Sequence, residues 1–142
     1  MIRKAQAADA EQLFALNEEF NGKGGATPES IRTSLLANPQ EIVIVADTGG
    51  VLAGFVCVQL KRSFCYDEYM PEITEVYVRP EYRRKGVARA MLAFAEEACA
   101  AGRRVPRFEL LTGTDNVAAQ ALYRALGYRE DGEIHLSKGL DS

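Results

Sequence analysis

The chain has 142 residues, of which 47% are hydrophobic, and a net charge of −3, so it can bury the core of one domain. The mild negative charge argues against a dedicated nucleic-acid binder, which would carry a basic excess over one face. The chain lacks a membrane-length apolar run of about 18 residues and the apolar stretch of a signal peptide, so we expect a cytoplasmic protein. Cys57, Cys65 and Cys99 match no zinc or disulfide spacing, and we expect no metal.

The first half of the chain predicts a strand, two helices and a pair of strands. Asp9 and Gln12 have the spacing of a capping box that opens the first helix. Thr27 and Pro28 are favoured at the N-cap and first position of the second helix. The turn at residues 47–50, Asp-Thr-Gly-Gly, separates two apolar runs as in a hairpin. The expected ranges are 2–5 for the strand, 9–21 and 27–38 for the helices, and 41–46 and 51–60 for the paired strands.

The second half predicts four strands and two helices. Apolar residues recur at helical spacing from Val87 to Ala98, and Gly102 provides a stop for that helix. The expected strands cover 73–78, 105–111, 128–130 and 134–137, and the expected helices cover 87–101 and 116–126. The predicted order is β-α-α-β-β-β-α-β-α-β-β, which is an α/β (α+β) fold.

A basic run, Arg83-Arg84-Lys85-Gly86-Val87-Ala88, lies between a predicted strand and a predicted helix. The first N–H groups of a helix have no intrahelical partner and the helix dipole adds positive potential, so this position suits a phosphate. Gly86 lets the backbone approach a ligand, and the cations, including Arg89, can neutralise a pyrophosphate. A solvated helix start and contact with a nucleic-acid backbone are the alternatives; the glycine three positions after Arg83 favours the phosphate.

This run resembles the signature Q/R-x-x-G-x-G/A of the GNAT superfamily of acetyl-CoA-dependent N-acetyltransferases, with Arg83, Gly86 and Ala88 at its defined positions. The resemblance extends through the strand 72–78 and the block 116–128. It implies one acetyltransferase domain over residues 1–142 with a mixed, mostly antiparallel sheet and helices on both faces. A split between the fourth and fifth strands takes the cofactor.

The resemblance implies that main chain of the fourth strand pairs with the pantetheine arm and supplies an oxyanion donor, while the basic run holds the pyrophosphate. The residues that we expect to bind acetyl-CoA are Val76, Tyr77, Val78, Arg83, Arg84, Lys85, Gly86, Val87, Ala88, Arg89, Asn116 and Tyr123. Arg84 stands where glycine is common in the family, and it would crowd the loop if it required a positive φ.

Direct attack of an amine on the thioester requires the neutral amine, and an alkylamine with a pKa near 10.4 needs a base at neutral pH. The resemblance makes Glu72 and Glu75 the candidates. Neighbouring residues alternate faces on a regular strand, so these side chains point to opposite faces unless a bulge intervenes. A solvated carboxylate or an ion pair with a nearby arginine is the structural alternative for each.

The departing thiolate of CoA needs a proton, and Tyr123 occupies the family position that supplies it. By helical spacing alone, Tyr123 is a core residue beside Leu122 and Leu126. Asn116 is expected to cap the same helix and to lie near the pantetheine.

We expect a small-molecule or peptide amine as acceptor, neither nucleic acid nor membrane as partner, and leave a homodimer open. Polyamine, aminoglycoside, amino acid, protein N-terminus and lysine all remain candidate acceptors. The alternatives to an enzyme are a CoA-binding regulatory or sensor module without catalysis and a protein-interaction scaffold.

Overall fold

The computed structural model describes residues 1–140. Within it the chain forms two compact units, Met1–Leu111 and the part from Thr112 onward, which we describe one at a time. The expectation of a single domain stays a prediction. Among the described residues, no helix is long and apolar enough to cross a membrane.

The first unit contains a sheet whose strands lie side by side in chain order, β1-β2-β3-β4-β5. The first four strands are antiparallel neighbours, and β5 is parallel to β4. The strands are β1 (Ile2–Lys4), β2 (Glu41–Thr48), β3 (Val51–Gln59), β4 (Glu72–Val78) and β5 (Glu109–Leu110). The helical elements of this unit are η1 (Ala7–Asp9), α1 (Ala10–Asn21), α2 (Pro28–Ala37), η2 (Pro80–Tyr82) and α3 (Val87–Ala100).

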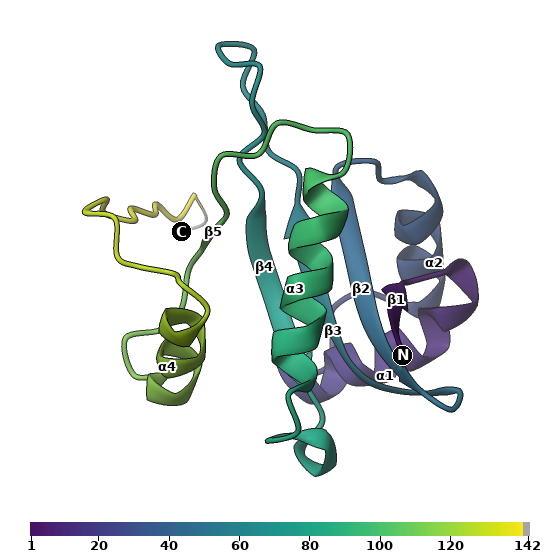
Figure 1. Ribbon diagram of the computed structural model, residues 1–142. Helices are drawn as coiled ribbons and strands as arrows, with labels where there is room; N and C mark the ends of the chain where they lie inside the picture. The colour runs from purple at the N-terminus through teal and green to yellow at the C-terminus, as the bar shows by residue number, and fades with distance from the viewer. Residues whose placement is uncertain (141–142) are drawn as a thin grey trace. The chain divides into compact units, whose positions relative to one another are not determined.

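Helices cover both faces of the sheet, with α3 on one face and α1 and α2 on the other (Figure 1). Under α1, Leu13 and Leu16 pack with Phe55 and Tyr77 of the sheet. On the other face, α3 buries Met91, Leu92, Ala95 and Cys99. The predicted fold, a mixed and mostly antiparallel sheet between helices, is confirmed.

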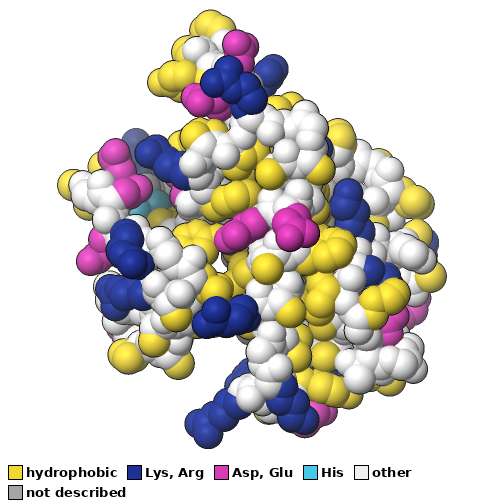
Figure 2. All heavy atoms as spheres, viewed as in Figure 1, with side chains coloured by type: hydrophobic (Ala, Val, Ile, Leu, Met, Phe, Trp, Pro, Cys, Tyr) yellow, Lys and Arg dark blue, Asp and Glu magenta, His cyan; other side chains and the backbone are white. Residues whose placement is uncertain are grey.

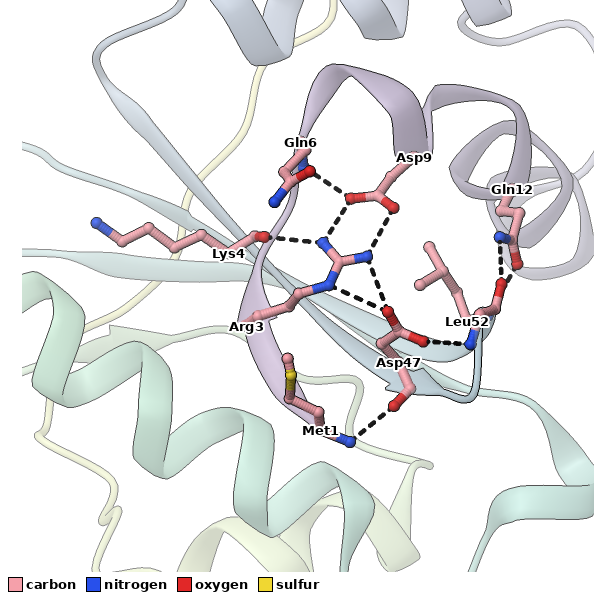
Figure 3. A network of polar contacts seen from close by, with 9 residues as sticks. Met1, Arg3, Lys4, Gln6, Asp9, Gln12, Asp47 and Leu52 are labelled. Atoms are coloured by element: carbon pink, nitrogen blue, oxygen red, sulfur yellow. Dashed lines mark hydrogen bonds and ion pairs between the residues drawn. The ribbon is translucent and has the colours of Figure 1, made fainter.

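Arg3 ties the first strand to the start of α1 and to the β2–β3 hairpin (Figure 3). Its guanidinium donates to both oxygens of Asp9, at 2.8 and 2.9 Å, and to Oδ2 of Asp47 at 3.1 and 3.2 Å. Asp9 is 6% exposed and also accepts the Gln6 N–H at 2.7 Å. These bonds, above all the one from Arg3, lower the pKa of Asp9.

The predicted capping box of Asp9 and Gln12 is wrong, although the helix begins where expected. Asp9 is the N-cap residue of α1 but its side chain does not cap that helix; its carboxylate accepts from Arg3 and accepts the Gln6 N–H in a capping box of η1. Gln12 instead reaches the hairpin, where its amide accepts the Leu52 N–H at 2.8 Å. A tertiary partner takes Gln12, whereas Asp9 belongs to a capping box that begins three residues earlier, at Gln6.

Two other local predictions are confirmed. Thr27 caps α2 by accepting the Ser30 N–H at 3.1 Å, and Pro28 is the first helical residue. Asp47 Oδ1 accepts the Gly50 N–H at 2.7 Å and closes the hairpin turn. These turns are set by residues close in sequence, so sequence patterns suffice to find them.

The strand predictions near the chain's end fail. The expected strand 105–111 shortens to Glu109–Leu110, the two residues that pair with β4; Pro106, which has no N–H to donate, lies outside it. The expected strands 128–130 and 134–137 do not form among the described residues, and Ile134 is 83% exposed. A strand needs a neighbour to satisfy its backbone groups, and alternation in sequence does not supply that neighbour.

The second unit contains α4 (Val117–Ala125). Asn116 caps this helix as predicted, accepting the Ala119 N–H at 3.2 Å. Gly127, at φ +100°, follows its C-terminus, where a left-handed residue ends the helix.

Candidate functional site

The loop before α3 has a backbone conformation suited to an anion. Arg84 has φ +63° and Gly86 φ +78°, so two left-handed residues lie just before the helix. The first helical hydrogen bond joins the Ala90 N–H to the Gly86 carbonyl at 3.0 Å. The N–H groups of the preceding turn therefore lack intrahelical acceptors, and such turns form anion-binding concavities.

The four cations around this loop do not play one role. Arg83 folds back, donating Nε–H to the Val78 carbonyl at 2.8 Å and lying 5.7 Å from the centre of the Tyr77 ring. Arg84, Lys85 and Arg89 are exposed. Figure 2 shows Lys and Arg side chains gathered at the lower end of the view, where Figure 1 places this loop. Arg83 thus fixes the loop to β4, while the other cations remain available to a ligand.

The β5 side of β4 is open next to this loop. The two strands pair only at Glu72 and Ile73 of β4, so within the described residues the rest of β4 has no strand partner on that side. The Tyr77 carbonyl faces β3, because a Cβ built on Gly54 would lie 2.3 Å from it. Alternation along the strand turns the main-chain groups of Val76 toward the open side.

The three predicted main-chain binders of β4 therefore differ. Val76 turns its backbone groups to the side of β4 that has no strand partner there among the described residues, and the Val78 carbonyl already accepts a bond from Arg83. The Tyr77 side chain is a core residue: it stacks on Phe20 at 5.0 Å between ring centres, and its hydroxyl donates to Glu19 Oε1 at 3.0 Å. Val76 is the best placed of the three to contact a ligand through its backbone.

A β-bulge at Thr74 places Glu72 and Glu75 on the same face of the sheet. Glu72 pairs with Gln59 and Glu75 with Cys57, while Thr74 has no partner on β3. Because Gln59 and Cys57 are two residues apart on a regular strand, their partners share a face. It is the face that α1 covers, since Cys57 packs against the cluster containing Leu16.

The two carboxylates nevertheless have different surroundings. Lys61 Nζ lies 3.1 Å from Glu72 Oε1 and also contacts Glu109, and these carboxylates raise the pKa of Lys61. Glu75 accepts a hydrogen bond from Asn21 Nδ2 at 3.3 Å, and no cation of the described residues forms an ion pair with it. Glu72 is held in a structural ion pair, whereas Glu75 forms no ion pair among the described residues and can still bind a cation or a proton.

Sequence reasoning missed Glu41, which lies on the same face of the sheet and is separated from Glu72 by Gln59 of β3. It pairs across the sheet with Gln59, whose amide donates to Glu41 Oε2 at 3.2 Å. Burial, with a smaller effect from Glu75, raises the pKa of Glu41. Burial also raises the pKa of the Cys57 thiol between them. The pairing of β2 with β3 brings Glu41 here, and its sequence position at a strand start gives no signal.

Tyr123 and Asn116 belong to the second unit. The Tyr123 ring packs edge-on against Tyr128 at 6.1 Å, and burial raises the pKa of its hydroxyl. Among the described residues, no group of three His, Cys, Asp or Glu side chains could hold a metal ion.

Comparison with known proteins identifies the relatives of this chain. Residues 10–128 match the model of the acetyltransferase (GNAT) family. An acetyltransferase of Yersinia enterocolitica is 27% identical over 140 residues, which are 98% of this chain and 94% of that protein.

Solved structures of acetyltransferases also superpose on this chain. The crystal structure of a probable acetyltransferase superposes with a TM-score of 0.81 at 27% identity, covering 100% of this chain and 98% of the other. The aminoglycoside N-acetyltransferase AAC(6')-Iy, in complex with a bisubstrate analog of CoA and acetylneamine, has a TM-score of 0.83 at 19% identity, covering 98% and 97%. At that identity, the second likeness establishes the fold alone.

Proposed function

Because the chain belongs to the acetyltransferase (GNAT) family and is an acyltransferase, we propose that it transfers the acetyl group of acetyl-CoA to a primary amine that attacks the thioester directly. The observation that carries this proposal is the open side of β4 beyond Ile73, next to the left-handed loop at the start of α3. A strand edge can pair with the amide groups of pantetheine, and the loop suits its pyrophosphate.

The residues of the loop fit acetyl-CoA. The N–H groups of Val87 and Ala88 supply donors, and exposed Arg84, Lys85 and Arg89 supply positive charge. Gly86 has φ +78° and nothing lies within 4 Å of a Cβ built there, so its space is open to a ligand. Its backbone conformation, not internal packing, requires glycine. Arg83 and Tyr77 act by holding the loop and β4 in place.

We assign the base to Glu75. In the proposed step, Glu75 accepts a proton from the amine, directly or through water, and the amine nitrogen forms a bond to the carbonyl carbon. The Val76 N–H stabilises the oxyanion. Glu72 is the weaker candidate because Lys61, 3.1 Å away, already neutralises it.

When the carbon–sulfur bond breaks, Tyr123 gives its hydroxyl proton to the thiolate of CoA, and Asn116 lies near the pantetheine. One support for this role is that a phenol is protonated at neutral pH and so has a proton to give; burial raises the pKa of Tyr123, which leaves the hydroxyl in that form but makes it a weaker acid. The family position of Tyr123 is the other support.

The acceptor that we propose is a cationic amine of a small molecule or peptide. Glu75 and Glu41 lie near each other on one face of the sheet, and together they favour a positive charge. The aminoglycoside N-acetyltransferase with which this fold superposes acts on such amines. We further propose a cytoplasmic location and no nucleic-acid partner.

The test measures acetyl-CoA binding by thermal shift and thiol release with a panel of amines. We expect acetyl-CoA to stabilise the protein and at least one amine to release free thiol. Binding without thiol release with any amine would favour the CoA-binding sensor. A folded protein that does not bind acetyl-CoA would favour the third alternative, a protein-interaction scaffold.

A further inference from the structure

A cavity of about 470 Å³ lies at the end of the first unit away from the loop that precedes α3. It is lined by Pro39, Gln40, Gln59, Leu60, Lys61, Arg62, Tyr69 and Arg103. These residues come from the start of β2, the end of β3, the loop before β4 and the turn after α3. The volume is in the range of small-molecule sites, roughly 300 to 1,000 Å³.

This cavity is separate from the loop that precedes α3. Arg103 follows the C-terminus of α3, whereas Gly86 precedes its N-terminus (Figure 1). At about 1.5 Å per residue, a helix of 14 residues spans about 21 Å. A ligand in the cavity therefore does not occupy the proposed pyrophosphate site.

The lining carries positive charge that nearby carboxylates do not cancel. Three of its residues are cations and none is acidic. The charge of Lys61 is matched by Glu72 and Glu109. Arg62 and Arg103 form no ion pair with a carboxylate of the described residues, so two guanidinium charges remain.

Tyr69 contacts both of these guanidinium groups. The Cζ atoms of Arg62 and Arg103 lie 5.4 and 5.6 Å from the centre of its ring. Arg103 Nη1 also donates to the Ala98 and Cys99 carbonyls at 3.4 and 3.3 Å, which anchors it at the end of α3. Both cations therefore lie next to the Tyr69 ring in the lining of the cavity, and planar guanidinium groups recognise carboxylates and phosphates and stack on flat groups.

Apolar and amide groups complete the lining. Pro39 and Leu60 provide apolar surface, and Gln40 and Gln59 provide amides. We propose that the cavity binds a small organic anion, with a carboxylate or phosphate monoester at Arg62 and Arg103 and a flat apolar portion against the rest of the lining. This site is independent of the proposed acetyl transfer.

Titration calorimetry of the full chain tests the proposal with benzoate and phenyl phosphate as the two anionic probes and benzyl alcohol as the neutral one. We expect at least one anion to bind with a Kd of about 1 mM or lower, and the alcohol not to bind. The two anions distinguish a carboxylate from a phosphate ligand. Arg62→Gln removes one exposed guanidinium and should weaken binding about tenfold.

Two matched arginine variants locate the binding. Arg32→Gln makes the same charge change on α2, and Arg84→Gln makes it at the loop before α3. Both should bind the anion as the unmodified chain does. The proposal is overturned if neither anion binds, if the alcohol binds equally well, if Arg62→Gln has no effect, or if Arg84→Gln abolishes binding.

Discussion

Replacement of Glu75 by Gln should produce an enzyme that works only at alkaline pH. An alkylamine with a pKa near 10.4 is neutral in roughly one molecule in 2,500 at pH 7, and a positioned base contributes about 10²- to 10⁴-fold. Glu75→Gln should therefore lower kcat/KM at pH 7 by about 100-fold or more. The residual rate should rise about tenfold per pH unit toward the pKa of the amine.

Glu72→Gln is the matched control, because it makes the same chemical change on the same strand and the same face. Glu72 is already paired with Lys61 at 3.1 Å, so its replacement should change kcat/KM less than about threefold and leave the pH profile unchanged. The assay is thiol release from acetyl-CoA between pH 6 and pH 10, with the thermal stability of each variant measured in parallel.

The reverse pattern, with the loss at Glu72, would refute the assignment and show that the ion pair does not prevent catalysis. Two variants with the unmodified pH profile would show that neither carboxylate is the base. Deprotonation would then fall to water, to Glu109 or to the pKa of the amine itself.

Four further predictions concern the rest of the site and its support. Gly86→Val should weaken acetyl-CoA binding in titration calorimetry, because φ +78° disfavours a branched residue and its side chain would occupy ligand space; unchanged affinity in a folded variant would argue against the loop assignment. Tyr123→Phe should lower kcat much more than the affinity for acetyl-CoA, whereas a purely structural ring predicts little kinetic change. Gly54→Ala should cost about 1–3 kcal/mol in urea unfolding, because the new Cβ would lie 2.3 Å from the Tyr77 carbonyl; a stability unchanged from the parent would contradict this packing. Asp9→Asn should cost about 1.5–3 kcal/mol at pH 7. Because the folded-state pKa of Asp9 is lowered, the difference should begin to shrink as the pH falls below about 4 and should be lost as the pH falls through the lower folded-state pKa; a difference independent of pH would exclude the carboxylate charge as its source.

The elements that sequence predicted well are those fixed by neighbours in the chain. The cap of α2 at Thr27 and the hairpin turn at Asp47 depend on side chains that bond backbone within three residues. The final strands were predicted by the same kind of pattern and did not form. Their formation depends on a partner strand, which a pattern of alternating residues does not specify.

The candidate site also has local features that the sequence could predict and features that depend on distant residues, which it could not. The glycine at 86 and the helix start that follows it could be found from sequence, because both are local; the left-handed backbone of Gly86 was seen only in the structure. The ion pair that distinguishes Glu72 from Glu75 could not be found from sequence, because it depends on Lys61, which follows the end of β3. Glu41 was missed because only the pairing of β2 with β3 brings it beside the other carboxylates.

The arrangement of β4 explains how one strand can serve both the core and the chemistry. Its side chains on one face include Tyr77, which is locked by Phe20 and Glu19. This anchoring holds the strand in place while its β5 side stays open beyond Ile73. The bulge at Thr74 then shifts the alternation by one residue, so that Glu72 and Glu75 both lie on the α1 face. A regular strand with the same sequence would put Glu72 and Glu75 on opposite faces, and only one of them could lie on the α1 face.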